Sequence, residues 1–155
     1  MRLTRYTDYA MRTLLYVAAH NDRLCSISQI AGAYGISKSN IMKVVSDLAE
    51  AGYLDTVRGR HGGVRLARPA NAINVGGVIR HTEEDFDLAD CGSCIIAAGC
   101  GLRGALGKAV EAFLMVLDEY SLADLNRDSD AVRALFIPAG KPQSSLDRSE
   151  QDPCP

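Results

Sequence analysis

Three cysteines lie close together in one short stretch of this sequence. Two residues separate Cys91 from Cys94 and five separate Cys94 from Cys100, and glycines stand among them. Thiolates are the ligands that soft metal centres prefer, and glycines allow backbone N–H groups to approach the sulfur atoms. The stretch therefore predicts a metal centre in a loop, which is typical of a sensor site.

Two other kinds of site use the same residue types. Cys91 and Cys94 have the C-x-x-C spacing of dithiol redox catalysts, but a thioredoxin-like site needs a βαβ setting, whereas acidic residues precede this pair and glycines follow it. A structural zinc site in an assembly module needs a fourth thiol or histidine, and the neighbouring sequence offers none. Both remain alternatives to the sensor.

Length and composition agree with an intracellular regulator. A chain of 155 residues is long enough for about one domain with its own core. The opening residues contain no long apolar run, so we expect neither a signal peptide nor a membrane span, and a cytoplasmic location. Five cysteines, an odd number, favour metal binding or redox chemistry over disulfides in that reducing compartment.

The net charge of −2 hides an uneven distribution. Residues 1–70 carry ten Arg and Lys against five Asp and Glu, whereas residues 71–155 carry seven against fourteen. A basic first half joined to an acidic second half fits a nucleic-acid-binding unit attached to a regulatory or assembly unit.

Helical periodicity and capping residues predict two helices in the basic half. Thr7 is expected to cap the first, with Asp8 in its first turn. The second begins with a capping box formed by Ser26 and Gln29 and ends at Gly35.

A third helix follows after a very short turn. Ser37 is expected to cap it and Gly52 to end it. Two short helices joined in this way form a helix-turn-helix, whose second helix enters the major groove of DNA. The outer face of that helix is expected to be polar and to contact DNA through Lys38, Ser39, Asn40 and Lys43.

A β-hairpin is predicted directly after this third helix. Residues 53–57 and 64–67 have strand character, and a glycine-rich connection with Arg58, Arg60 and His61 joins them. A hairpin in this position is the wing of a winged helix. Its glycines are expected to allow close approach to DNA, while its cationic side chains supply charge and hydrogen-bond donors.

The remaining periodicity completes a mainly α fold with a small β-hairpin. A short helix is predicted near 75–79, a long amphipathic helix from 102 to 120, and a brief helix near 122–125. The apolar stripe of the long helix is too extended for one small domain to cover, so we interpret it as a dimerisation helix, with packing inside one chain as the alternative. We expect a DNA-binding domain over 1–80, a cysteine loop over 81–101, dimerisation and packing segments over 102–137, and a disordered tail over 138–155.

Several segments together resemble a known family. The opening residues 1–12, the wing over 57–70 and the three-cysteine stretch resemble the winged-helix iron-sulfur regulators of the IscR, NsrR and RirA family. Within that family the sequence looks most like the nitric-oxide-sensing repressors of the NsrR type, from Met1 to about Asp124. The resemblance implies a homodimer that binds a double-stranded DNA operator, also through Arg2 and Thr4, and releases nitric-oxide detoxification promoters when nitric oxide reacts. An iron-status regulator of the RirA type is the alternative.

The resemblance also implies a cofactor and its ligands. Cys91, Cys94 and Cys100 would hold an iron-sulfur cluster of the 4Fe-4S type, with Asp8 of the partner subunit as the fourth ligand. The Cys91 to Cys94 spacing is shorter than is usual in the family, which leaves the 2Fe-2S type as an alternative. IscR-like members carry a histidine where this sequence has Arg103, so no histidine ligand is implied.

Overall fold

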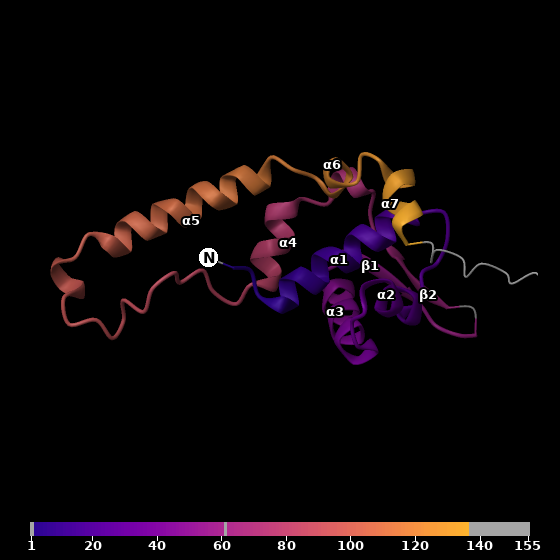
Figure 1. Cartoon of the computed structure of the whole chain (residues 1–155), viewed down its shortest axis with the longest axis horizontal. Coiled ribbons are helices and arrows are strands. Elements are labelled where there is room, and N and C mark those ends of the chain that lie inside the picture. Colours follow the sequence, from indigo (N-terminus) through magenta and orange to yellow (C-terminus); the bar gives the residue numbers. More distant parts are fainter. Residues whose placement is uncertain (1, 61, 137–155) are drawn as a thin grey trace, which may run out of the picture.

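The structure is a computed structural model that describes residues 2–60 and 62–136 (Figure 1). The predicted tail over 138–155, His61 and Cys154 lie outside these residues. The helices are α1 (Arg5–Ala19), α2 (Ile27–Tyr34), α3 (Lys38–Glu50), α4 (Val75–Thr82), α5 (Leu102–Asp118), α6 (Leu122–Leu125) and α7 (Ser129–Leu135), with short 3-10 turns at Ala70–Ala72 and Ala97–Gly99. Strands β1 (Leu54–Val57) and β2 (Gly63–Leu66) form an antiparallel hairpin. The predicted fold class is confirmed.

The capping residues explain where the first helices begin. Ser26 and Gln29 form the predicted capping box of α2, and Gly35 ends that helix with a positive φ of 64°. The predicted cap of α1 was wrong. Thr4 caps α1 by accepting a hydrogen bond from the Thr7 N–H, because α1 begins one turn earlier than the apolar spacing indicates, and Thr7 is fully buried.

The core of the molecule lies between α1, α2 and α3. Its fully buried side chains include Leu14, Val17, Ile30, Ile41 and Leu48, at the helical spacing that the sequence shows. Burying such aliphatic side chains contributes roughly 1.5–3 kcal/mol each. The core therefore fixes α3 on α1 and presents the opposite face of α3 to solvent.

Helix α5 extends away from this core. Figure 1 shows it running outward beyond α4, with the cysteine loop at its far end. Val110 is the one buried residue of α5. Met115 and Val116 are 67% and 55% exposed but lie outside the apolar stripe; within the stripe, Leu102 is 52% exposed, whereas Phe113, Leu114 and Leu117 are half-buried. The single chain therefore covers the stripe only in part.

The C-terminal end of α5 is fixed to α4. Arg80 donates two hydrogen bonds to the Asp118 carboxylate, with N–O distances of 2.5 and 2.6 Å, and this holds the pKa of Asp118 below its usual value. The Asn74 amide donates to the Asp118 carbonyl at 2.7 Å, and an antiparallel bridge joins Asn74 to Ser121. The direction of α5 is thus set at this end.

The ion pair between Arg80 and Asp118 requires a residue without a side chain at Gly76. A Cβ on Gly76 would overlap the Asp118 carboxylate, whereas on Gly77 the nearest atom would lie 3.6 Å away. We expect Gly76→Ala to lower the free energy of unfolding by about 1–3 kcal/mol, as overpacking does. Gly77→Ala is the matched control and should leave stability unchanged or slightly raised, because alanine favours helices. Thermal unfolding followed by circular dichroism measures both; equal midpoints would contradict this packing.

Candidate functional site

The cysteine loop is organised by successive three-residue turns. The Cys94 N–H donates to the Cys91 carbonyl, the Ala97 N–H to the Cys94 carbonyl, and the Cys100 N–H to the Ala97 carbonyl, at N–O distances of 3.4, 3.1 and 3.4 Å. The cysteines therefore stand at the junctions of consecutive turns. The backbone, and not a packed core, gives the loop its shape.

The first of these turns has a side-chain cap. Asp90 accepts hydrogen bonds from the Ser93 hydroxyl at 2.7 Å and from the Ser93 N–H at 3.3 Å, which lowers the pKa of Asp90. Beyond Ser93 the loop is open to solvent, and Ile95 is 98% exposed. Cys94 is exposed, and Cys91 and Cys100 are half-buried. All three thiols are therefore accessible to a small reactant.

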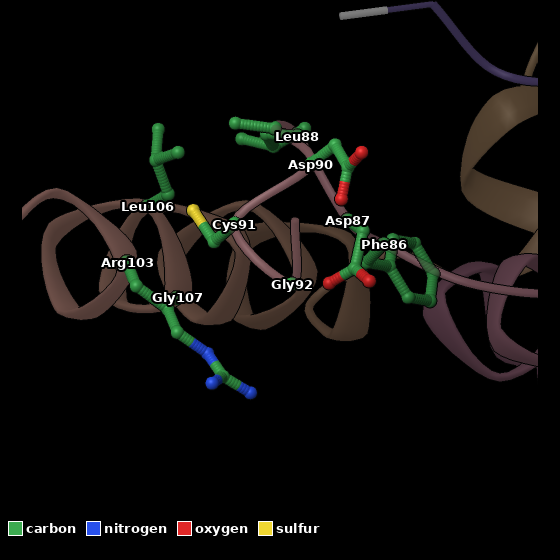
Figure 2. A pocket seen from close by; sticks show the side chains of 10 residues that line it. Phe86, Asp87, Leu88, Asp90, Cys91, Gly92, Arg103, Leu106 and Gly107 are labelled. Carbon is green, nitrogen blue, oxygen red and sulfur yellow. The ribbon is translucent and has the colours of Figure 1, made fainter. Parts of the chain in front are cut away.

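A recess of about 310 Å³ lies beside Cys91. Figure 2 shows Cys91 on the segment of residues 86–92, which lies beside α5. Leu106 lies on the same side as the Cys91 sulfur, whereas the Arg103 guanidinium extends away from Cys91. The recess is lined by Phe86, Asp87, Leu88, Ala89, Asp90, Cys91, Gly92, Arg103, Leu106 and Gly107.

Asp8, the predicted fourth ligand, lies elsewhere in the chain. It is half-buried on α1 and forms an ion pair with Arg12 at 2.9 Å, while the Arg12 guanidinium lies over the Tyr34 ring. Across residues 2–60 and 62–136, no three His, Cys, Asp or Glu side chains gather as they would around a metal ion. One chain therefore does not bring Asp8 and the thiols together.

Cys25 has a different environment from the loop thiols. It is fully buried and pairs with Val64 of β2 through two backbone hydrogen bonds of 2.9 and 2.8 Å. Burial raises the pKa of the Cys25 thiol, because a thiolate is poorly solvated there. Cys25 is part of the core.

The polar residues of α3 differ in where they face. Lys38, Ser39 and Lys43 are exposed, as expected, whereas Asn40 is half-buried beside α1. Successive residues of a helix are rotated by about 100° around its axis. Asn40 therefore lies roughly 90° from the centre of the buried face, on the side of α1. Lys38 lies roughly 70° from that centre, on the side of the hairpin. The outer face is thus narrower than the sequence indicates.

The hairpin carries exposed cations, and two of its glycines lie against the protein's own backbone. Arg58 and Arg60 are exposed, and Gly59 has a φ of 115°. A Cβ on Gly62 would collide with the Val57 carbonyl and one on Gly63 would lie 2.8 Å from the Cys25 carbonyl. Gly62 and Gly63 therefore permit close approach of the protein's own backbone.

The N-terminal segment contacts the segment that leads to the cysteine loop. Arg2 is exposed, but Thr4 donates to the Glu83 carboxylate from its N–H at 2.8 Å and from its hydroxyl at 3.2 Å. Thr4 therefore forms hydrogen bonds in two directions, accepting one as the cap of α1 and donating two to the Glu83 carboxylate.

A three-residue network that the sequence analysis missed connects α4 to α3. Asp47 of α3 accepts a hydrogen bond from the Tyr6 hydroxyl at 2.8 Å, and its other oxygen lies 2.9 Å from His81 Nε2. Tyr6 and Asp47 are 41 positions apart in the sequence, and Asp47 and His81 are 34 apart, so no local pattern indicates the network. It joins α4, which holds α5, to the helix-turn-helix.

The sequence that forms this helix-turn-helix, hairpin and cysteine loop matches the model of a known family. The sequence model of Rrf2, described as an iron-dependent transcriptional regulator, matches residues 3–128. The chain belongs to the Rrf2 family. As a member of Rrf2 it is a transcriptional regulator and not an enzyme.

Known Rrf2 relatives are similar over most of their length. The chain is 46% identical over 142 residues to the HTH-type transcriptional regulator NsrR of Bacillus licheniformis, covering 88% of this chain and 99% of that protein. Its identity to NsrR of Bacillus subtilis is 43% over 142 residues, covering 88% and 97%. The IscR structure from T. potens matches with a TM-score of 0.69 at 26% identity, covering 86% of this chain and 91% of that chain.

Neither α5 nor any other helix in the described part of the chain combines the length and apolar character that a bilayer crossing requires.

Thiol environment predicts thiol reactivity. In reduced, metal-free protein carrying Cys154→Ser, we expect Cys91, Cys94 and Cys100 to react rapidly with a disulfide reagent such as DTNB at neutral pH. Cys25 should react only on unfolding, since it is buried and its pKa is raised. Counting released thiolate with and without denaturant measures this, and Cys25→Ser should leave the native count unchanged. A fourth fast thiol in the native protein would contradict the assignment.

Proposed function

We propose that this protein is a DNA-binding repressor whose cysteine loop carries an iron-sulfur cluster, and that nitric oxide, by reacting there, releases promoters of nitric-oxide detoxification genes. The observation that carries the proposal is an exposed three-thiol loop at the free end of a helix whose other end is bonded to α4 of the DNA-binding unit. The 46% identity to an NsrR protein supports it.

The donor set fits such a cluster. Cys91, Cys94 and Cys100 provide three soft ligands, and the turns between them leave the thiols accessible. A bound cluster supplies iron that a small neutral molecule can attack. We propose the 4Fe-4S type, with 2Fe-2S as the alternative. Because the three thiols do not converge in the single chain, binding has to draw the exposed loop together.

The proposed fourth ligand is Asp8 of the partner subunit. Asp8 is half-buried, and its ion pair with Arg12 holds it at a defined position on α1. As a ligand it would exchange that cation for iron. A carboxylate oxygen is a hard donor and is displaced from iron more readily than a thiolate. This position would therefore be the reactive one.

The proposed homodimer rests on the apolar stripe of α5, which the single chain covers only in part. Leu102 of this stripe is 52% exposed, and Phe113, Leu114 and Leu117 are half-buried. Burying the stripe against the same stripe of a second copy removes this apolar surface from water. Two DNA-binding units related in this way would contact two half-sites about one helical turn apart.

DNA contacts are assigned to the exposed cations around the helix-turn-helix. In the major groove we propose Lys38 and Ser39, with Asn40 and Lys43 on the same helix. From the hairpin we propose Arg58, Arg60 and, outside the described residues, His61. Arg2 and Thr4 complete the set. The boundaries proposed are 1–80 for the DNA-binding domain, 81–101 for the loop and 102–137 for dimerisation and packing.

Contacts of α4 connect the two functions. Arg80 bonds to α5, His81 to α3, and Glu83, which follows α4 directly, to the N-terminal segment. The signal can change DNA affinity only by the difference in affinity between the intact and the damaged form. A shift of the loop and α5 would reach α3 through α4. We propose that the intact form binds DNA more tightly.

An iron-status regulator is the second candidate. The description of the Rrf2 family as iron-dependent favours it. It uses the same loop and the same DNA contacts and differs only in the signal. The tests of the cofactor and of DNA binding therefore apply to both candidates. The two are distinguished by whether nitric oxide or a lack of iron removes the cluster.

The cofactor is tested by isolating the protein without oxygen. We expect brown protein with iron and acid-labile sulfide, because three accessible thiols lie in one loop. Cys91→Ser, Cys94→Ser and Cys100→Ser should each remove the colour, whereas Cys25→Ser and Cys154→Ser should keep it. Stoichiometric zinc without sulfide in the unchanged protein would overturn the proposal.

The DNA contacts are tested separately with a duplex selected by the protein from a random library. Arg60→Ala should weaken binding and reduce the slope of log affinity against log salt by about one, since one fewer charge faces the backbone. Lys38→Ala should change the preferred sequence, as loss of a base-edge contact does. Unchanged affinity and preference in both variants would exclude this mode of docking.

A further inference from the structure

A small recess lies between the N-terminal turns of α1 and the flank of α3 that faces α1. It has a volume of about 280 Å³ and is lined by Arg5, Tyr6, Tyr9, Asn40 and Lys43. Two of these side chains are cationic, and one carries an amide. Arg5 and Tyr9 have no role in the function proposed above.

The cations in this recess have no carboxylate partner among the described residues. Neither Arg5 nor Lys43 forms an ion pair within residues 2–60 and 62–136. Asp47 lies on the same side of α3, but its two oxygens are occupied by the Tyr6 hydroxyl and His81. Neither Arg5 nor Lys43 is therefore paired with Asp47.

Tyr6 completes the lining without adding negative charge. Burial, together with the hydrogen bond to Asp47, raises the pKa of Tyr6 to about 12. The hydroxyl therefore stays protonated at neutral pH. It donates a hydrogen bond to the Asp47 carboxylate at 2.8 Å.

The position of Asn40 on α3 favours a backbone contact over a base contact. Asn40 is half-buried on the flank of α3 that faces α1, beside Arg5 in the recess, whereas Lys38 is exposed. An amide on this flank is directed toward the edge of the groove in which α3 would lie. Phosphate oxygens line that edge, and Arg, Lys and Asn are the side chains that contact them most.

We propose that this recess binds one phosphodiester group of the DNA backbone, with Arg5 and Lys43 supplying the charge and Asn40 a hydrogen-bond donor. The inference rests on the proposed DNA binding. The phosphate contact fixes the position of α1 and α3 on the duplex but carries no sequence information. Asn40 and Lys43 are then positioning residues, and base recognition is left to Lys38 and Ser39.

The test combines protein variants with DNA in which single phosphates are replaced by uncharged methylphosphonates. Arg5→Ala should weaken binding roughly tenfold or more, by the same factor on a selected duplex and on an unrelated one, since hydrogen bonds to charged groups contribute at this level. Asn40→Ala and Lys43→Ala should also leave the preferred sequence unchanged. Arg127→Ala removes the same charge from the connection between α6 and α7, away from the recess, and is the control.

The decisive result is the coupling between the two changes. At one backbone position, methylphosphonate should weaken binding of the unchanged protein but have little further effect on Arg5→Ala, because both remove the same contact. Additive penalties at every position would overturn the site. The site would also be overturned if Asn40→Ala changed the preferred DNA sequence. It would be overturned as well if Arg5→Ala abolished binding of inorganic phosphate but left the DNA affinity unchanged. If the unchanged protein binds no duplex, the proposed function itself fails, which is a separate outcome.

Discussion

The ion pair between Arg80 and Asp118 is the constraint on which the arrangement of this molecule depends. Helix α5 buries one residue against the rest of the chain, so its packing alone cannot fix its direction. The two hydrogen bonds from Arg80, the Asn74 amide and the bridge at Ser121 all act at the C-terminal end of α5. These contacts therefore also determine the position of the cysteine loop at the N-terminal end of α5.

A half-exposed ion pair of this kind adds little to the free energy of folding. Its importance is geometric, since a bidentate arginine–carboxylate pair has a defined orientation. Gly76 shows how closely α4 and α5 approach there, because a single added carbon would displace the carboxylate. The same short helix contacts α3 through His81, and so the element that directs the loop also contacts the DNA-binding unit.

Local chemistry made much of the fold predictable. The capping box at Ser26, the glycine at 35 and the apolar spacing of α3 each act within a few residues, and each appears as predicted. The cap of α1 was misplaced because two threonines three residues apart can both cap a helix, and only the burial of Thr7 decides between them. Long-range polar contacts, such as that between Asp47 and His81, leave no periodic pattern in the sequence.

The candidate site was predictable in composition but not in arrangement. The three cysteines and their glycines indicate soft-metal chemistry, yet in a single chain they stand on separate turns and Asp8 pairs with Arg12. An intersubunit ligand cannot be inferred from one chain's geometry. Likewise, the face on which Asn40 lies depends on where α1 packs against α3.

The central claim, that nitric oxide acts at the cysteine loop to control DNA binding, is tested most directly by DNA release. Protein loaded anaerobically and bound to its selected duplex should be mixed either with a few equivalents of nitric oxide or with an iron chelator, while DNA anisotropy and cluster absorption are recorded together. We expect nitric oxide to bleach the cluster and release DNA within seconds, whereas the chelator should act far more slowly. Rapid release by the chelator, with DNA binding insensitive to nitric oxide, would contradict the central claim and identify iron status as the signal.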